Sequence, residues 1–300
     1  MIKLPFGVDI DNLIEDLRIF SWEASEILLF YSKRIKDNNQ RKDIIKNNND
    51  EDPVTLADLK VNELIIRRIK EKYMNINWKI LSEESVKIRN GCCDIESEWL
   101  WILDPLDGTK DFIQGTENYA MHLALNYRHK PILGVVLIPE RDELWISFGD
   151  ELFCENRIGL RKNYAISQNN NLSDMSLVTS KNHRNEILKE LIDKINFKKN
   201  IVMGSIGCKI ASIIRGESDI YISLSLPGQS SPKDWDFASP EAILRAAGGA
   251  ITTINNEELV YNSKNFEHPG LIIASNSRQN HKSFCLQLRE IIKEYNICSI

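Results

Sequence analysis

The residues best suited to chemistry stand together at 104–109, Asp-Pro-Leu-Asp-Gly-Thr. An apolar run before them predicts a strand buried on both faces, which delivers Asp104 to its end, and we expect Pro105 to terminate it. Asp104 and Asp107, on the turn that follows, can then point at one spot. Backbone N–H groups at Gly108 and Thr109, where a helix could begin, would bind an anion. Carboxylates repel a phosphate unless a cation lies between them, and oxygen ligands of this kind suit Mg²⁺.

The same stretch also has a purely structural interpretation, in which Asp-Gly is a turn and Asp104 ends a strand at the surface. Other carboxylates shift the balance toward a metal site. Glu83 also follows a strand-like apolar run, and Asp236 stands just before a helix-like segment. Taken alone, Asp236 and Asp58 are more simply helix N-caps. Glu84 is expected on the solvated surface.

Two other aspartate motifs match the sequence poorly. Haloacid-dehalogenase phosphatases use Asp-x-Asp-Gly-Thr at the first strand, with the first Asp as nucleophile. Here the two Asp residues are three positions apart and stand near residue 104. A Ca²⁺ loop of the EF-hand type needs Asp-x-[Asp/Asn]-x-[Asp/Asn]-Gly, which Pro105 and Leu106 do not fit.

Helices and strands must carry these residues to one place. The spacing of apolar residues, with Asp9 as an N-cap, predicts helices at 10–28, 59–73, 184–195, 206–215 and 240–247. Short apolar runs predict strands at 78–81, 99–103, 121–127, 132–138, 144–148, 152–155, 176–179, 201–203 and 219–224. The polar segment 36–52 is predicted to be a loop, and its nearness to Asp58 suggests a flap over the site.

The pattern of predicted elements changes in the polar stretch 163–171. Before it, helices and hairpin-like strands indicate an α+β domain, 1–165, which would hold the metal and phosphate site. After it, alternating strands and helices indicate an α/β domain, 166–300, which would supply Asp236 and residues on the substrate side. We therefore predict an α/β fold class for the chain.

Composition narrows the class of protein without revealing its chemistry. The chain has 300 residues, 42% of them hydrophobic, and a net charge of −5, which fits an enzyme-sized globular protein and disfavours a nucleic-acid polymer as partner. No apolar run is long enough for a membrane helix, and Asp9 and Asp11 come too soon for a signal peptide. Six Cys without a C-x-x-C pair indicate a reducing, cytoplasmic setting. The oligomeric state is not fixed, and a homodimer is left open.

Four blocks of the sequence carry a family resemblance. They are Asp52-Pro-Val-Thr-x-Ala-Asp58, Ser82-Glu-Glu-Ser85, the 104–109 stretch, and Trp235-Asp-x-Ala238 with Ala-Gly-Gly at 247–249. In this order and spacing they resemble the inositol monophosphatase superfamily of Mg²⁺-dependent, lithium-sensitive phosphatases. The resemblance implies a layered αβαβα sandwich over essentially the whole chain.

Within that superfamily, the chain is most similar to the 3′(2′),5′-bisphosphate nucleotidases of sulfur metabolism. The similarity lies in Lys110-Asp-Phe112, in Gly204-Ser-x-Gly-x-Lys209, and in Lys233-Asp-Trp-Asp236 followed by Pro-Glu. Ser239-Pro240 departs from the usual Ala-Gly, and Ile206 replaces a Ser. The branch implies hydrolysis of 3′-phosphoadenosine 5′-phosphate to AMP and phosphate. An inositol monophosphatase and a fructose-1,6-bisphosphatase-like enzyme are the alternatives.

The resemblance also implies a ligand set for two to three Mg²⁺ ions. Glu83, Asp104 and the backbone carbonyl of Leu106 would hold the first ion, and Glu83 would help a third, looser one. Asp104, Asp107 and Asp236 would hold the second, with Asp104 bridging the two. Such an arrangement can neutralise the attacking and the leaving oxygen of an in-line displacement.

The remaining roles follow from the same resemblance. The nucleophile would be a metal-bound water, oriented by the Thr109 hydroxyl with Asp58 as the acceptor behind it, and no phosphoenzyme is expected. The residues implied to contact the substrate are Glu83, Leu106, Asp107, Gly108, Thr109, Ser205, Lys209, Lys233 and Asp236. The alternative for Lys209 and Lys233 is a solvated surface charge. From another class, the chain could be a non-catalytic nucleotide or sugar-phosphate sensor, for which Asp58 and Thr109 would be unnecessary.

Overall fold

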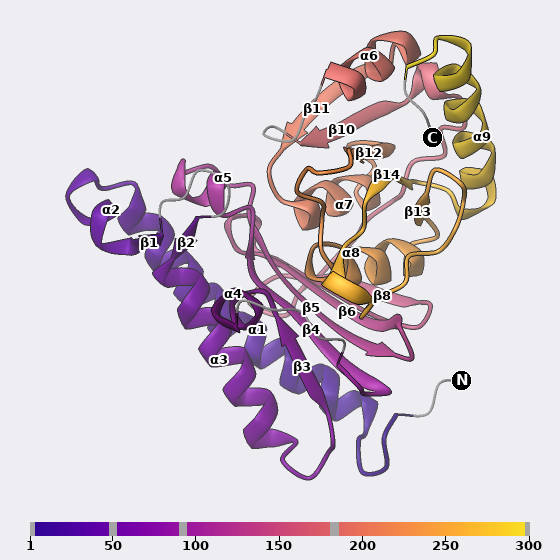
Figure 1. Cartoon of the computed structure of the whole chain (residues 1–300). Coiled ribbons are helices and arrows are strands. Elements are labelled where there is room, and N and C mark those ends of the chain that lie inside the picture. Colours follow the sequence, from indigo (N-terminus) through magenta and orange to yellow (C-terminus); the bar gives the residue numbers. More distant parts are fainter. Residues whose placement is uncertain (1–3, 48–52, 90–94, 181–185, 298–300) are drawn as a thin grey trace.

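Two β-sheets with helices around them form five layers (Figure 1). The computed structural model describes residues 4–47, 53–89, 95–180 and 186–297. In order, the layers are a helix pair, a seven-stranded sheet, a second helix pair, a five-stranded sheet and a third helix pair. This arrangement confirms the predicted αβαβα sandwich.

The seven-stranded sheet carries most of the site. Its strands, in spatial as well as chain order, are β3 (Lys79–Ser82), β4 (Trp99–Asp107), β5 (Ala120–Tyr127), β6 (Lys130–Ile138), β7 (Glu143–Phe148), β8 (Glu151–Glu155) and β9 (Arg161–Lys162). β3 runs parallel to β4, and the other neighbours are antiparallel. Every residue of β4 after Trp99 is buried, as expected for a strand covered on both faces.

The five-stranded sheet mixes parallel and antiparallel pairs. Its spatial order is β11 (Lys199–Met203), β10 (Ser176–Ser180), β12 (Ile220–Ser225), β14 (Gly270–Ser275) and β13 (Ala250–Thr253). β10 is parallel to both of its neighbours, whereas β14 is antiparallel to both of its own. Parallel pairs need crossover connections, and α6 and α7 supply them.

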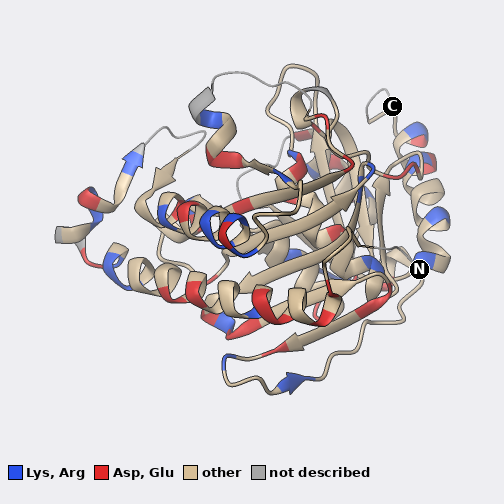
Figure 2. Ribbon diagram, turned by 90° about the horizontal axis from the view of Figure 1, so that it is seen from below, with Lys and Arg blue, Asp and Glu red and all other residues tan. Residues whose placement is uncertain are grey.

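Three helix pairs bury the faces of these sheets. α1 (Ile10–Ile35) and α3 (Leu56–Lys72) cover the outer face of the first sheet, and α6 (Glu186–Ile195) and α9 (Arg278–Glu294) cover that of the second. α7 (Ile206–Ile214) and α8 (Asp234–Ala246) lie between the sheets. Figure 2 shows charged residues mainly on the helices and at the ends of strands. No described helix is long and apolar enough to cross a bilayer.

Short elements complete the fold. They are α2 (Asn38–Ile44), β1 (Ile45–Asn47), β2 (Val54–Thr55), α4 (Glu83–Arg89), α5 (Thr109–Ile113), η1 (Pro139–Arg141), η2 (Leu172–Asp174) and η3 (Lys264–Phe266). The predicted loop 36–52 thus contains a short helix, α2, and a strand, β1, that pairs with β2, while residues 48–52 lie outside the described ranges. Asp52, which opens the first sequence block, and Arg184, where a helix was predicted to start, also lie outside them.

Local sequence explains where the helices begin. The Asp9 side chain accepts a hydrogen bond from the Asn12 N–H, so its predicted role as N-cap of α1 is confirmed. α3 begins earlier than predicted, because Thr55 is its N-cap and forms a capping box with Asp58. α8 also begins early, at Asp234, and passes through Pro240.

β4 is longer than predicted, because it continues through Pro105 to Asp107. The neighbouring strand pairs Asp104 with His122 but Asp107 with Ala120, so three steps on β4 match two on β5. This β-bulge accommodates Pro105, which has no N–H to give to the ladder. The prediction that Pro105 ends the strand is therefore wrong.

Candidate metal and active site

The bulge in β4 places two carboxylates on one face of the sheet. In a regular strand, residues three positions apart point to opposite faces. Asp104 and Asp107 lie opposite His122 and Ala120, which are two apart on β5 and share a face. Asp104 and Asp107 therefore face the same side, toward the middle layer.

Asp236 reaches the same place from the middle layer, in the first turn of α8. One carboxylate oxygen each of Asp104, Asp107 and Asp236 lies within 4.8 Å of the others. The backbone N–H of Lys233 donates a hydrogen bond to Oδ2 of Asp236 at 2.5 Å. Burial, followed by repulsion from Asp107, raises the pKa of Asp236 to about 7.

Glu83 lies near Asp104 because β3 pairs with β4 in parallel. Ser82 lies in register with Leu103, and Glu83 is the next residue, at the start of α4. The Nζ atom of Lys87 lies 3.0 Å from Glu83.

Glu84, predicted to be solvated, is buried, and Lys87 Nζ donates to it at 3.2 Å. The negative charge of Glu84 helps to raise the pKa of Asp58. Neighbouring residues in the short helix α4 point in different directions, and the sequence pattern did not reveal which of Glu83 and Glu84 would be buried.

The charge balance of the cluster tests whether a cation fits. Burial raises the pKa of Asp104 well above its usual value, and Glu83, Asp107 and Asp236 raise it further. The donor set consists of carboxylate oxygens alone, which is what Mg²⁺ prefers over softer ligands. A divalent cation would relieve this repulsion, so the residues fit a magnesium site.

The pKa of Asp107 is shifted in the opposite direction from those of Asp104 and Asp236. Burial pushes its pKa up, but His122, Lys209 and Ser205 outweigh burial, and the net pKa is lowered. Its Oδ2 accepts hydrogen bonds from the Ser205 hydroxyl at 2.5 Å and the Gly207 N–H at 3.1 Å. Asp107 is thus the carboxylate that the fold holds ionised.

Asp58 and Thr109 form the second part of the site. Asp58 is fully buried, and its Oδ2 accepts from the backbone N–H and the hydroxyl of Thr55 at 2.8 and 2.5 Å. The Thr109 hydroxyl lies 3.4 Å from Asp58 Oδ1 and 2.9 Å from the carbonyl oxygen of Leu106. Burial is the main reason that the pKa of Asp58 is raised to about 7.

Gly108 allows the chain to turn between β4 and α5. Its φ of +89° lies in the left-handed region, where a side chain is strained. A Cβ at this position would also lie 2.8 Å from the carbonyl oxygen of Asn118 and 3.2 Å from Ser205 Cβ. A glycine is therefore required here by both conformation and space.

The three residues expected on the substrate side contact the protein itself. Ser205 caps α7 and donates to Asp107, and it is fully buried. Lys209 is also fully buried, so its interpretation as a solvated surface charge is wrong, and its Nζ donates to the Gly204 carbonyl at 2.7 Å. Burial lowers the pKa of Lys209 to about 8, against the pull of Asp107. Lys233 pairs with Glu267 at 2.6 Å and is partly exposed.

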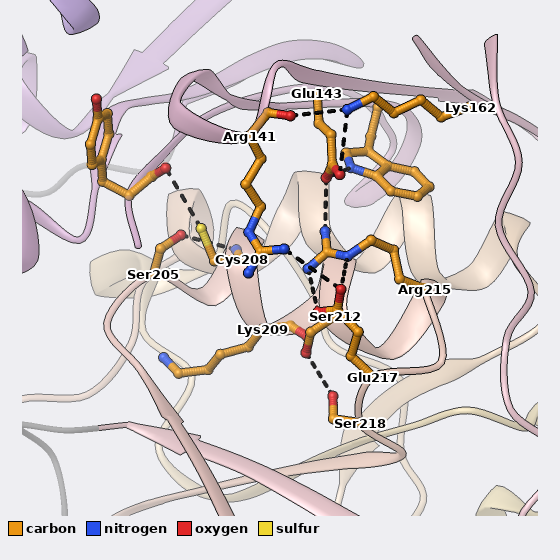
Figure 3. Close-up of polar contacts among 12 residues, drawn as sticks. Arg141, Glu143, Lys162, Ser205, Cys208, Lys209, Ser212, Arg215, Glu217 and Ser218 are labelled. Atoms are coloured by element: carbon orange, nitrogen blue, oxygen red, sulfur yellow. Dashed lines mark hydrogen bonds and ion pairs between the residues drawn. The ribbon is translucent and has the colours of Figure 1, made fainter. Parts of the chain in front are cut away.

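An ion-pair network fixes the far end of α7 (Figure 3). Arg215 donates to Glu143 of β7 at 2.8 Å and to both carboxylate oxygens of Glu217, also at 2.8 Å. Glu143 further accepts from the Trp145 indole N–H at 3.1 Å. This partly buried network ties α7 to the first sheet, and Ser205 and Gly207 at the other end are thereby held against Asp107.

Sequence reasoning missed His122, which is buried on β5 with its Nε2 3.2 Å from Asp107 Oδ2. A polar residue within the apolar run 120–125 was the available signal. That His122 lies beside the carboxylates follows only from the strand register, which pairs it with Asp104.

Comparison with known proteins gives one consistent family. Residues 10–293 match the inositol monophosphatase family. The protein described as 3′(2′),5′-bisphosphate nucleotidase CysQ of Buchnera aphidicola is 32% identical over 212 residues, which cover 71% of this chain and 75% of that protein. The CysQ of Haemophilus influenzae is 24% identical over 257 residues, which cover 85% and 89%.

Solved structures of the same family share the fold. An IMPase of Thermotoga maritima superposes with a TM-score of 0.70 at 22% identity, covering 95% of this chain and 98% of that one. The CysQ of Bacteroides thetaiotaomicron superposes with a TM-score of 0.65 at 25% identity, covering 85% and 94%.

Proposed function

Because this chain belongs to the inositol monophosphatase family, we propose that it is a Mg²⁺-dependent phosphomonoesterase and, more specifically, a 3′(2′),5′-bisphosphate nucleotidase. Its family makes it a phosphatase, a hydrolase of small phosphate esters. The observation that carries the proposal is the convergence of Asp104, Asp107 and Asp236 within 4.8 Å in the middle of the fold.

The proposed metal ligands are carboxylates from three separate elements. Asp104, Asp107 and Asp236 would hold one Mg²⁺ ion, and Glu83, Asp104 and the Leu106 carbonyl would hold another. When bound, Mg²⁺ neutralises phosphate charge and makes a water more acidic. The Gly108 and Thr109 N–H groups would hold the phosphate oxygens, because they stand at the strand–helix turn that follows these ligands.

Asp58 and Thr109 are proposed to direct the attacking water. The Thr109 hydroxyl has one proton and two acceptors, the Leu106 carbonyl and Asp58. If the Leu106 carbonyl turns to a cation, the Thr109 proton is left for Asp58. The hydroxyl oxygen then accepts a hydrogen bond from the water and fixes its direction of attack.

The proposed substrate is 3′-phosphoadenosine 5′-phosphate. Hydrolysis would break the bond between the 3′-oxygen and phosphorus, with water supplying the new oxygen, and would release AMP and inorganic phosphate. The CysQ name of the sequence relatives supports this choice over an inositol ester. Ser205, Lys209 and Lys233 remain the proposed residues for the substrate's second phosphate and adenosine side.

The chain is also proposed to work as two parts, 1–165 and 166–300. The first holds the seven-stranded sheet with Asp58, Glu83, Asp104 and Asp107, and the second contributes Asp236 on α8. The site would then lie where the two parts meet.

A cytoplasmic location is proposed on the state of the cysteines. Cys154, Cys208 and Cys285 are buried and unpaired among the described residues. Free thiols of this kind fit a reducing compartment.

Phosphate release across a substrate panel tests the function. Purified protein would be given 3′-phosphoadenosine 5′-phosphate, inositol 1-phosphate and fructose 1,6-bisphosphate, with Mg²⁺ and with EDTA. We expect Mg²⁺-dependent release with a clear preference for the nucleotide. A preference for the inositol or sugar ester would overturn the nucleotidase assignment, and binding without release in Mg²⁺ would indicate a sensor.

A further inference from the structure

His122 joins the two parts of the chain that carry the carboxylate cluster. Its ring is buried, at 1% exposure. Nε2 lies 3.2 Å from Asp107 Oδ2, at the end of β4. Nδ1 lies 3.2 Å from the backbone carbonyl oxygen of Trp235, the residue before Asp236. One imidazole therefore spans from one proposed metal ligand to the peptide that carries another.

Three polar contacts of Asp107 are all made by one of its two carboxylate oxygens, Oδ2. Oδ2 accepts hydrogen bonds from the Ser205 hydroxyl and the Gly207 N–H, both at the start of α7, and lies 3.2 Å from Nε2 of His122 on β5. With Oδ2 engaged in this way, Oδ1 is the atom left to face a cation. A ligand whose outer oxygen is fixed does not have to be ordered when the cation binds, and partners of this kind contribute to metal affinity.

The packing around His122 shows that the fold keeps room for this ring. A Cβ on Gly207 would lie 2.2 Å from His122 Nε2 and 2.9 Å from Val136 Cγ1. Gly207 lies within α7, where alanine would otherwise be the better helix former. Glycine at this position lets α7 approach closely enough for its N–H and the imidazole to reach the same Asp107 oxygen.

We propose that His122 is a positioning residue that sets Asp107 and Asp236 at the spacing a divalent cation needs. The inference rests on the metal site of the proposed function, but not on the choice of substrate. His122 acts from outside the ligand set, through the hydrogen bond between Nδ1 and the Trp235 carbonyl and the 3.2 Å contact between Nε2 and Asp107. Losing it would loosen both the side chain from β4 and the first turn of α8.

Substitutions at His122 can separate its two contacts. An asparagine amide reaches about as far as Nδ1 and keeps the Trp235 contact, whereas a glutamine amide reaches about as far as Nε2 and can still contact Asp107. His281→Asn is the matched control. His281 is also buried, with Ser275 and Thr252 on its two nitrogens at 2.7 and 2.8 Å, but it lies on α9 in the outermost layer.

Mn²⁺ binding to the substrate-free full chain, with the free ion counted by electron paramagnetic resonance, tests the proposal. We expect His122→Asn to raise the Mn²⁺ Kd about 10–100-fold and His122→Gln to recover most of that loss. Gly207→Ala, which displaces the ring without removing it, should also raise the Kd. His281→Asn should leave the Kd unchanged, even if it lowers the Tm.

Several outcomes would overturn the proposal. One is a folded His122→Asn protein whose Kd lies within about twofold of the original. Others are equal losses in the Asn and Gln variants, and a loss in His281→Asn as large as in His122→Asn. Absence of Mn²⁺ binding by the unsubstituted chain would remove the metal site and the proposal with it. If His122→Asn fails to fold by circular dichroism, an unchanged Kd in Gly207→Ala overturns the proposal instead.

The binding experiment also separates this inference from the nucleotidase assignment. If Mn²⁺ binds and responds to His122 as expected, but the substrate panel yields no phosphate, the proposed function fails while the positioning role stands.

Discussion

The hydroxyl of Thr109 lies 3.4 Å from Oδ1 of Asp58, although the two residues stand 51 positions apart in the chain. Asp58 is fixed by the capping box at the start of α3, and Thr109 by the turn at the start of α5. The site therefore joins the first turns of two helices that are far apart in the chain. Neither residue is among the proposed metal ligands, which allows the contribution of the pair to turnover to be separated from metal binding.

Asp58→Asn should lower turnover more than metal affinity. Asn keeps the shape of the side chain and can still accept from the Thr55 N–H, so the capping box largely survives. It cannot accept a proton, and loss of a general base typically costs about 10²–10⁴-fold in rate. Measurement of kcat for phosphate release and of the Mn²⁺ Kd on the same protein checks this. A Kd that rises while kcat holds would instead place Asp58 among the metal ligands.

Asp104→Asn should stabilise the metal-free protein at alkaline pH. The pKa of Asp104 is raised in the fold, so between its unfolded and folded values the native state binds more protons than the unfolded chain. Stability is therefore lost as pH rises through this range, and Asp236, with its pKa raised to about 7, acts in the same direction. Asn avoids this loss, and it can still accept from the Leu106 N–H.

Thermal unfolding in EDTA at pH 5 and pH 8 measures the effect. Asp104→Asn should have a higher Tm than the original, and the gain should be larger at pH 8 than at pH 5. Asp150→Asn, at a side chain that is 91% exposed, is the control and should change nothing. Adding Mg²⁺ should reverse the order, because only the unsubstituted site binds it well. A variant that is less stable than the original at pH 8 in EDTA would contradict the account.

Gly108→Ala should destabilise the protein more than a glycine substitution elsewhere. Both Gly108, with φ +89°, and Gly228, with φ +81°, would strain an alanine by about 1–2 kcal/mol. A new Cβ at Gly228 meets nothing within 4 Å, whereas one at Gly108 meets the Asn118 carbonyl at 2.8 Å. Urea unfolding of both variants should therefore show a loss of roughly 3 kcal/mol at Gly108 against about 1 kcal/mol at Gly228. Equal losses in the free energy of unfolding would mean that the close approach of a Cβ at Gly108 to the Asn118 carbonyl does not destabilise the protein.

Apolar spacing predicted most of the helices and strands, and the family resemblance implied how they are layered. Boundaries failed where a local rule was overridden. Pro105 lies inside β4 because a bulge removes the need for its N–H, and Pro240 lies inside α8, whose true start is Asp234. α9 was not predicted at all, although it is amphipathic and buries Phe284 and Leu288.

The candidate carboxylates were found through their motifs, whereas their supporting groups were not. Asp104 and Asp107 stand in one recognisable stretch, but the reason that they share a face is a register irregularity with no signature in the sequence. His122 and Glu84 acquire their surroundings only through strand pairing and helix packing. Local patterns identify residues that can bind an ion, and tertiary contacts decide which others hold them in place.

The central claim, that these separate carboxylates hold divalent cations, is tested most directly by a crystal structure of the protein grown with Mn²⁺. Anomalous diffraction would locate the ions independently of any activity. We predict one strong anomalous peak in contact with Asp104, Asp107 and Asp236, and a second peak in contact with Asp104 and Glu83. A well-ordered structure at saturating Mn²⁺ with no anomalous peak among these side chains would contradict it.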